Sequence, residues 1–278
     1  MAPRKISIVT PSFNQAPFIE ENILSVVNQK YPNLEHIIID GNSTDGTVGI
    51  LKRYSHLRWI SEPDNGQTHA LNKGFRMTTG EIVGWVNSDD TYCPDILNSV
   101  AERFNDPAVM VVCGDGYEID DKGQIIKPVS SLRATPEDLI RYWKWHYEFI
   151  QPSFFFRRKV FDEVGYLDES LYYAMDVEFF IRLGKRYKFD YLKKPLANLR
   201  YYSTTKTGRN SGKILPGYIR EMHTVSTRFW GEKTSWKYYS YLFSFLFAIG
   251  WSFVKNILFL PGSKSKDRIK KMYINIKH

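Results

Sequence analysis

Cysteine is scarce in this sequence. Only two cysteines, Cys93 and Cys113, occur among the 278 residues, so no framework of disulfides is expected to hold the fold together. So low a number fits a reducing compartment. No secretory leader pattern precedes the first strand-like segment, which begins at Lys5. From these two absences we expect a cytoplasmic protein.

The signatures of several common enzyme classes are also missing. No G-x-G-x-x-G follows a strand-like segment, which leaves a dehydrogenase-type dinucleotide site unsupported. Gly41 and Gly46 have the spacing of a P-loop, but Thr47 and Val48 stand where Lys and Ser or Thr are needed. There is no H-E-x-x-H motif, no zinc-type cysteine pair and no G-x-S-x-G nucleophile elbow.

Acidic residues are outnumbered by basic ones. The formal net charge is +8, which favours anionic partners such as nucleotides, nucleic acid or an acidic membrane surface. Much of the basic excess lies near the C-terminus, and we identify no aromatic-lined basic groove. We therefore expect no nucleic-acid partner.

Strand-like and helical segments alternate through the first ninety residues. Short apolar runs suit buried strands, and helical spacing of apolar residues separates them. The strand-like runs are residues 5–10, 36–40, 58–61 and 82–86, and the helical segments are 18–29, 47–54 and 67–77. This alternation with short connections predicts an α/β fold with a doubly wound, mostly parallel sheet.

Each of the four strand-like runs ends in polar residues. They are residues 10–14, 40–45, 62–65 and 87–90. In open α/β sheets, ligands bind beyond the carboxyl ends of the strands. Asp89 and Asp90 repel each other unless a positive charge lies near them, and a divalent cation with oxygen ligands is the usual remedy. Taken alone, this segment is equally explained by a solvated turn.

The middle of the chain is less regular. It contains a helical segment, a strand and a hairpin, followed by a helix start at Thr135, a strand, a helix and two further strands. In the same order, these are residues 95–104, 109–113, 114–123, 135–138, 153–156, 175–187, 189–192 and 195–202.

The composition changes after Ser203, and we predict a helical, aromatic-rich extension over residues 206–278. Helices are expected at 216–229 and from 235 onward. Residues 238–254 carry no charge, but this run falls short of the ~20 residues that a spanning helix needs. A basic tail follows from Lys264. This combination is typical of an interfacial helix on an anionic leaflet, with packing against the domain or a dimer partner as the alternative.

An ordered set of motifs runs through the preceding part of the chain. It comprises residues 9–14, 39–47, 72–74, 79–82, 87–90 and 174–176, with Arg182 following. Their order and spacing resemble the family 2 glycosyltransferases of the GT-A fold, over about residues 4–205. We therefore expect a catalytic domain at 1–205. The resemblance implies an inverting transfer of a sugar from a nucleotide-diphosphate donor, for which we expect a UDP-sugar.

The resemblance also assigns roles to single residues. Asp176 is implied as the general base that removes a proton from the acceptor hydroxyl, although an acid at a helix start is also a common N-cap. Asp89 is implied as the ligand of a divalent metal, Mn²⁺ or Mg²⁺, that stabilises the departing diphosphate. Asp40 is implied as a partner of the base, with capping of its own loop as the alternative. The other implied donor-site residues are Thr10, Pro11, Asn14, Glu62, Lys73, Asn87 and Ser88.

The acceptor side is less defined by the motifs. Trp145, His146, Gln151 and Arg182 are its candidates, while core packing explains the tryptophan and an internal ion pair explains the arginine nearly as well. Asn87 stands where many members of the family carry a third acid, which lowers the local charge. Tyr202 stands where a histidine is common, which puts a diphosphate contact in doubt.

These features together predict a glycosyltransferase of polysaccharide biosynthesis on the cytoplasmic face of the plasma membrane. A glycan or a lipid-linked saccharide is the expected acceptor. A nucleotidyltransferase is one alternative, but it needs a basic triphosphate loop after the first strand, and residues 10–15 carry no positive charge. A catalytically silent nucleotide-sugar- or carbohydrate-binding module is the other alternative.

Overall fold

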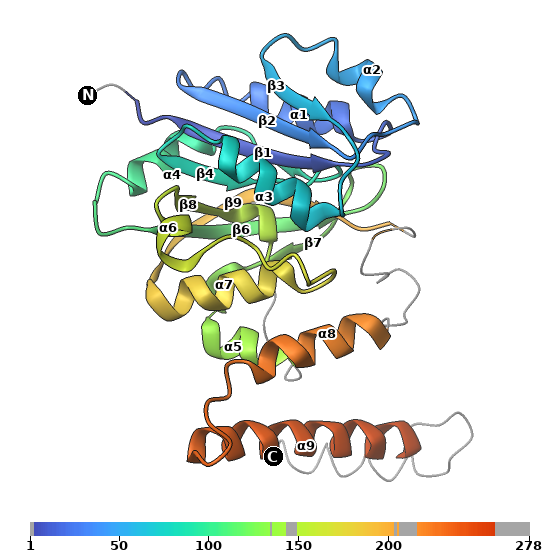
Figure 1. Ribbon diagram of the computed structural model, residues 1–278, viewed down its shortest axis with the longest axis vertical. Coiled ribbons are helices and arrows are strands. Elements are labelled where there is room, and N and C mark those ends of the chain that lie inside the picture. The colour runs from blue at the N-terminus through green and yellow to red at the C-terminus, as the bar shows by residue number, and fades with distance from the viewer. Residues whose placement is uncertain (1–2, 134, 143–148, 203–204, 206–215, 259–278) are drawn as a thin grey trace, which may run out of the picture.

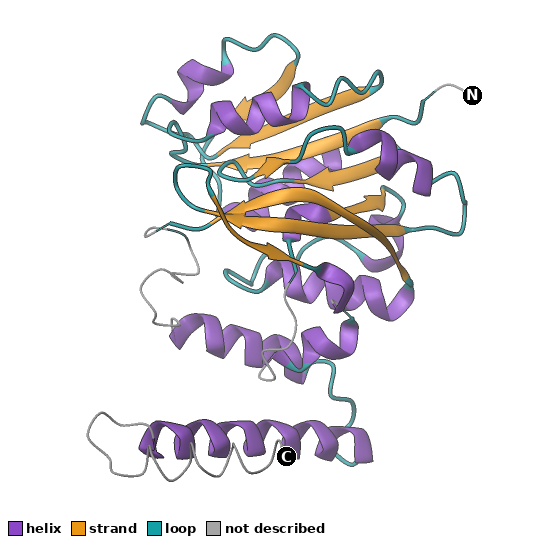
Figure 2. Ribbon diagram, turned by 180° about the vertical axis from the view of Figure 1, so that it is seen from behind, coloured by secondary structure: helices purple, strands orange, loops and turns teal. Residues whose placement is uncertain are grey.

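A nine-stranded mixed sheet forms the centre of the protein (Figure 1). The computed structural model describes residues 3–133, 135–142, 149–202, 205 and 216–258. The strand order is β3-β2-β1-β4-β8-β6-β9-β5, and β7 pairs with β6 beside this path. Helices cover both faces of the sheet (Figure 2).

The N-terminal half has the predicted alternation. Its strands β1 (Ile6–Ser12), β2 (Leu34–Asp40), β3 (Leu57–Ser61) and β4 (Ile82–Trp85) are all parallel. The helices between them are α1 (Ile19–Val27), α2 (Thr47–Leu51) and α3 (Gln67–Met77). Their apolar residues pack on opposite faces, because Val26 of α1 clusters with Ile8 whereas Leu71 of α3 clusters with Val9. The prediction of a doubly wound α/β sheet is confirmed here.

The second half of the sheet is mixed. Strand β8 (Phe154–Arg157) runs antiparallel to both β4 and β6 (Val111–Ile119). Along its other edge, β6 pairs in parallel with β9 (Phe189–Arg200), and the short β5 (Thr91–Tyr92) pairs antiparallel with β9. Strand β7 (Ile125–Val129) completes the predicted hairpin with β6.

Strand β9 corrects one sequence prediction. The sequence predicts two strands, at 189–192 and 195–202, and the structure has one strand instead. Its pairing with β6 shifts register on both sides of Asp115, which lies opposite Pro195. A proline is tolerated in a strand at such an irregularity. Pro195, the first residue of the second predicted strand, therefore marks a bulge within one continuous strand. Strand β5 and helix α6 (Val160–Val164) are too short to be identified from periodicity.

The remaining helices pack on the sheet and on one another. They are α4 (Leu97–Arg103), α5 (Pro136–Ile140), α7 (Met175–Arg186), α8 (Pro216–Thr227) and α9 (Trp236–Leu258), with 3₁₀ turns η1 (Ser131–Arg133) and η3 (Gln151–Ser153). An aromatic core joins β8 to α7, where the rings of Phe154 and Phe180 stack at 4.3 Å. Met222 of α8 and Tyr241 of α9 belong to this same core cluster. The first helices of the predicted extension therefore share the core of the sheet domain.

Helix α9 is the element for which a membrane role is predicted. Within the described part of the chain, none of the helices combines the length and apolarity required to traverse a bilayer.

Buried Glu35 of β2 gives a pH-dependent prediction. Burial on its own would raise the pKa of Glu35, but hydrogen bonds from the Ser7 hydroxyl (2.5 Å) and the Thr79 amide (2.6 Å) prevail and lower it from 4.5 to about 2. The carboxylate therefore stabilises the fold fully above pH 4.5, and this contribution is lost as the pH falls towards 2.

We expect Glu35→Gln to lower the free energy of unfolding at pH 7 by about 2 kcal/mol, the value typical of a hydrogen bond to a charged group. The gap between variant and wild type should close as the pH falls from 4.5 to 2, as followed by urea denaturation at each pH. Glu102→Gln on the exposed side of α4 is the control. A gap of constant size at every pH would contradict the assignment.

Candidate functional site

A large cavity opens beyond the carboxyl ends of β1, β2 and β4, and its volume is about 750 Å³. Its wall combines residues from strand ends, from the starts of helices α3 and α7, from strand β9 and from α8. Its lining residues include Pro11, Phe13, Gly41, Asp64, Asn87, Ser88, Asp89, Asp90, Tyr172, Tyr173, Asp176, Tyr202 and Tyr218. The cavity lies where the sequence predicts a ligand site for a parallel sheet.

Asn87 is the centre of a hydrogen-bond network at the end of β4. Its side-chain oxygen accepts from Gln67 of α3 (2.8 Å) and from the Trp85 indole (2.9 Å). Its amide nitrogen donates to the Asp90 carboxylate (3.0 Å) and to Gln151 (3.1 Å). The amide thus uses both of its ends, and no acidic side chain can make the same set of contacts.

The two adjacent carboxyls differ in their surroundings. Both oxygens of Asp90 are bound within the protein, one by the Arg200 backbone amide (2.8 Å) and the other by Asn87. Asp89 lies in the cavity wall, and its Oδ2 accepts from the Tyr202 hydroxyl (3.1 Å). Burial raises the pKa of Asp89, and burial together with its neighbour Asp89 raises the pKa of Asp90 well above its usual range.

Arg200 is buried beside this pair but does not neutralise it directly. Its guanidinium donates to the Asp89 backbone carbonyl (2.8 Å) and forms an ion pair with Glu21 (2.5 Å). It also bonds the backbone carbonyls of Asp120 and Asp121 in the hairpin between β6 and β7. Arg200 therefore fixes the backbone around the two acids. Its ion-pair partner is Glu21 and not either of their carboxylates.

Tyr202 makes contacts through both its ring and its hydroxyl. Its ring lies 4.9 Å from that of Phe18, and its hydroxyl reaches Asp89. Burial raises the pKa of Tyr202, with the negative charge of Asp89 acting in the same direction. The phenol therefore stays protonated and serves as a hydrogen-bond donor at the predicted diphosphate position.

Asp176 lines the same cavity. It lies in the first turn of α7, and its Oδ1 accepts from the Val177 amide (2.8 Å). The positive end of the helix dipole favours an ionised carboxylate there. The structure therefore brings Asp89 and Asp176, which are far apart in sequence, to one cavity.

The predicted donor residues fall into two groups. Pro11, Asn87 and Ser88 line the cavity. Thr10 and Asp40 are fully buried beneath it, where Thr10 pairs with His36 (3.0 Å).

Asp40 makes the contacts of a residue that caps its own loop, which is the alternative to binding the base of the donor. One oxygen accepts from the Ser43 hydroxyl (2.5 Å), and the other accepts from the Ser43 amide (2.9 Å) and the Ser61 hydroxyl (2.7 Å). Asn14 likewise bonds the same loop, since its side-chain oxygen accepts from the Thr44 amide (2.9 Å). Both residues therefore hold the loop after β2, whose Gly41 lines the cavity.

Glu62 and Lys73 form an ion pair with each other and do not line the cavity. Their neighbour Asp64 does line it, beside Phe13 and Gly41. A Cβ on Gly41 would lie 2.8 Å from the Asp64 carboxylate, so the glycine allows this close approach. The polar strand end predicted at residues 62–65 marks the segment correctly, but alternation alone does not show which acid faces inward.

The acceptor candidates are also separated by the structure. Gln151 lines the cavity but is buried, and it binds both Asn87 and the Trp85 carbonyl (3.0 Å), so it supports the end of β4. Arg182 is not among the lining residues; it pairs with Glu178 (2.8 Å) and bonds the Tyr166 carbonyl (2.7 Å). These contacts correspond to the alternative of an internal ion pair. Trp145 and His146 lie outside the described residues.

Three tyrosines that line the cavity are not identified by the sequence motifs. Tyr172 and Tyr173 precede Asp176, and Tyr218 comes from α8. The rings of Tyr172 and Tyr173 meet edge to face at 4.7 Å, and those of Tyr173 and Tyr218 at 6.2 Å. The only sequence signal for them was aromatic content, which core packing explains as well.

The chain is similar in sequence to known glycosyltransferases. The chain is 28% identical over 216 residues to an uncharacterized glycosyltransferase of Rickettsia typhi, a match that covers 74% of this chain and 67% of the relative. It is 36% identical over 128 residues to TuaG of Bacillus subtilis, a glycosyltransferase named for teichuronic acid biosynthesis, over 41% of this chain and 50% of that one. The matched regions thus leave a third to a half of these relatives uncovered.

Solved structures share the fold at low identity. S. aureus TarS 1–349 in complex with UDP-GlcNAc has a TM-score of 0.63 at 18% identity, over 83% of this chain and 68% of that one. The mannosyltransferase PcManGT of Pyrobaculum calidifontis, in complex with GDP-Man and Mn²⁺, has a TM-score of 0.59 at 17% identity, over 100% and 82%. The model of glycosyl transferase family 2 matches residues 7–165. Since this match covers more than half of the chain, the protein belongs to glycosyl transferase family 2 and is an enzyme with the GT-A fold.

Proposed function

We propose that this glycosyltransferase transfers a sugar, with inversion, from a nucleotide-diphosphate donor to a hydroxyl of a glycan or lipid-linked saccharide. The observation that carries the proposal is that Asp89 and Asp176, which are far apart in sequence, both line one cavity. In the reaction, the acceptor oxygen forms a bond to the anomeric carbon while the bond to the diphosphate breaks. Asp176 takes the proton of the attacking hydroxyl.

A UDP-sugar is our preferred donor. The structural neighbour TarS binds UDP and UDP-GlcNAc, whereas PcManGT binds GDP-Man, so the neighbours support a nucleotide sugar more strongly than a particular base. The name of TuaG supports a role in polysaccharide biosynthesis. Phe13, Gly41 and Asp64 form the part of the wall beyond β1 and β2, and we assign it to the nucleoside.

We further propose that Asp89 holds a divalent cation, Mn²⁺ or Mg²⁺. The side chains fit such an ion, because Asp89 lies in the cavity wall whereas both oxygens of Asp90 are bound by the protein. Among the described residues, no group of three acidic, histidine or cysteine side chains forms a complete cage. A cation shared between one carboxylate and the donor phosphates needs no such cage. When bound, it would stabilise the charge of the leaving diphosphate.

The exposed face of α9 supports a peripheral location on the cytoplasmic face of the membrane. Tyr241 and its neighbours at helical spacing pack into the core, yet the opposite face is apolar as well. Its exposed residues are Trp236, Tyr239, Phe243, Leu246 and Phe247. A helix that is apolar on both faces is normally covered on both. Because the sequence continues into a basic tail from Lys264, an anionic membrane is the partner we propose for this face.

The enzymatic proposal is tested with Asp176→Asn and Asp89→Asn. We expect Asp176→Asn to lower kcat by about 10²- to 10⁴-fold, the usual contribution of a general base, with unchanged affinity for UDP. Asp89→Asn should weaken UDP binding in the presence of Mn²⁺, since the metal ligand is lost. A screen of sugar nucleotides for transfer and calorimetry with UDP and Mn²⁺ give these values.

Asp162→Asn on the exposed side of α6 is the matched control, because it makes the same chemical change away from the cavity. Transfer at the wild-type rate by both cavity variants would refute the assignment. Nucleotide binding by the wild type without turnover of any donor would favour a silent binding module.

Asn87→Asp would restore the third acid that many relatives carry, and we expect it to destabilise this protein. The change replaces the donors to Asp90 and Gln151 by an acceptor and adds a charge beside two buried carboxyls. The free energy of unfolding at pH 7 should fall by about 2–4 kcal/mol. Chemical denaturation without metal measures it, with Asn105→Asp in the exposed turn after α4 as the control. Equal stability of variant and wild type would contradict the network.

Membrane association is tested by co-sedimentation with vesicles. Wild type should bind vesicles that contain anionic lipid, and Phe243→Ser with Phe247→Ser should weaken this binding at least tenfold, as expected for losing about 1.5 kcal/mol of apolar burial. Ile125→Ser on the exposed face of β7 is the control. If the double variant instead converts a dimer to a monomer and leaves vesicle binding unchanged, the face is a protein interface.

A further inference from the structure

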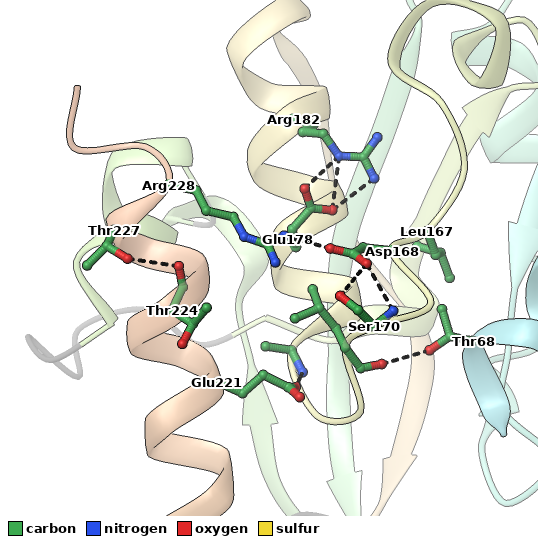
Figure 3. A network of polar contacts seen from close by, with 12 residues as sticks. Thr68, Leu167, Asp168, Ser170, Glu178, Arg182, Glu221, Thr224, Thr227 and Arg228 are labelled. Atoms are coloured by element: carbon green, nitrogen blue, oxygen red, sulfur yellow. Dashed lines mark hydrogen bonds and ion pairs between the residues drawn. The ribbon is translucent and has the colours of Figure 1, made fainter. Parts of the chain in front are cut away.

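The loop that leads into the predicted base is held from two sides. It comprises residues 167–174, between α6 and α7, and Asp176 follows in the first turn of α7. Figure 3 shows its contacts, with α3 on one side and α8 on the other. Since a base acts only at hydrogen-bond distance from its substrate, whatever fixes this loop fixes the reaction geometry.

Helix α3 grips the first part of the loop. Asn72 binds both backbone groups of Leu167, donating to its carbonyl (3.0 Å) and accepting from its amide (3.0 Å). One turn earlier on the same helix, the Thr68 hydroxyl donates to the Leu171 carbonyl (3.1 Å). These contacts connect the loop to the helix whose first residue, Gln67, supports Asn87 in the metal motif.

Helix α8 grips the end of the loop next to the base. The Glu221 carboxylate accepts the backbone amides of three consecutive residues: Tyr172 (2.8 Å), Tyr173 and Ala174 (2.6 Å). Ala174 is the N-cap residue of α7, so an acid from another helix satisfies amides at this helix start. Just beyond the end of α8, Arg228 forms an ion pair with Asp168 of the loop (2.6 Å).

The tyrosine wall depends on the same helix. Tyr173 lies between Tyr172 and Tyr218, and all three line the cavity. A Cβ on Gly217 would lie 3.2 Å from the Tyr173 ring, so the absence of a side chain there lets α8 approach closely. The first turns of α8 thus contact both the backbone and a ring of the segment that precedes Asp176.

We propose that Glu221 is a positioning residue for glycosyl transfer. By binding three successive amides, it sets the direction in which α7 begins and orients Asp176 and the tyrosine wall toward the acceptor sugar. The inference rests on the proposed role of Asp176 as the base. The inference places α8 in the same functional unit as Asp176, whereas the predicted domain boundary at residue 205 assigns α8 to a separate extension.

Glu221→Gln tests the inference. In the wild type, two carboxylate oxygens accept hydrogen bonds from three backbone amides. Glutamine has only one such oxygen, and its NH₂ group would face amide N–H groups that are themselves donors. We expect kcat for transfer to fall by about 10- to 100-fold, the range associated with a misplacement of about 1 Å. UDP affinity should stay within twofold of wild type, because the donor wall is not altered. Glu221→Asp keeps the carboxylate and should recover part of kcat.

Glu232→Gln, which removes the same charge from the exposed turn after α8, should match wild type in every measurement. If Glu221→Gln retains wild-type kcat and acceptor KM, the inference is wrong even though the proposed function stands. If the wild type transfers no sugar at all, the proposed function itself fails. A loss of UDP affinity in parallel with kcat, or a loss with no recovery in Glu221→Asp, would indicate a general structural role and overturn the inference.

Gly217→Ala is a second test that leaves Glu221 intact. Alanine favours the helix, so the variant is expected to fold, but its Cβ crowds the Tyr173 ring. We expect the KM for the acceptor to rise at least threefold while UDP affinity is unchanged. An unchanged acceptor KM would show that α8 does not shape the acceptor wall.

Discussion

The site depends on keeping two adjacent carboxyls at the end of a strand, with Asp90 buried and Asp89 half-buried. Burial raises the pKa of both Asp89 and Asp90, so the fold must supply hydrogen bonds that a buried anion requires. Asn87 and the backbone of Arg200 satisfy Asp90 completely. Asp89 lines the cavity beside it, and its carboxylate accepts a hydrogen bond from the Tyr202 hydroxyl.

The same constraint explains why asparagine is suited to position 87. Its amide supplies donors to Asp90 and Gln151 and an acceptor to Gln67 and Trp85. A third carboxylate would add charge where two already lack a full counter-charge. The departure from the family pattern is thus linked to the packing of this particular network, which includes a glutamine more than sixty positions away.

Sequence patterns predict the first half of the fold well because its information is local. Four apolar runs with polar ends determine both the strands and the edge at which ligands bind. Strand β9 is different, because its continuity through Pro195 depends on a bulge against β6 that no periodicity reveals. Short elements such as β5 exist only because a distant strand pairs with them.

Within the site, the sequence identifies segments better than it identifies side chains. The polar strand end at residues 62–65 marks a cavity edge, yet Glu62 pairs with Lys73 away from the cavity while Asp64 lines the wall. Asp40 ends its strand as predicted, yet its oxygens bind the serines of its own loop and a neighbouring strand. Which of several polar neighbours faces a cavity depends on turn geometry and on partners from other strands, and both are tertiary properties.

Two helices transmit the positions of the reacting groups across the cavity. Helix α3 contacts Asn87 through Gln67 and the loop before Asp176 through Thr68 and Asn72. Glu221 of α8 and Arg228, just beyond its end, contact the same loop. Asn72 belongs to the motif at residues 72–74, but no motif marks Thr68, Glu221 or Arg228, because these side chains bind backbone groups or an ion-pair partner.

Helix α8 therefore connects the cavity wall with helix α9. Its first turns hold the loop of the base, and Trp230, just beyond its end, packs against Tyr241 of α9 with ring centroids 6.0 Å apart. A partner that binds the exposed face of α9 would thus be linked to the tyrosines of the cavity through the aromatic contacts of Trp230 and through α8. For an acceptor carried by a lipid, this arrangement would hold the acceptor side of the cavity near the membrane that supplies it.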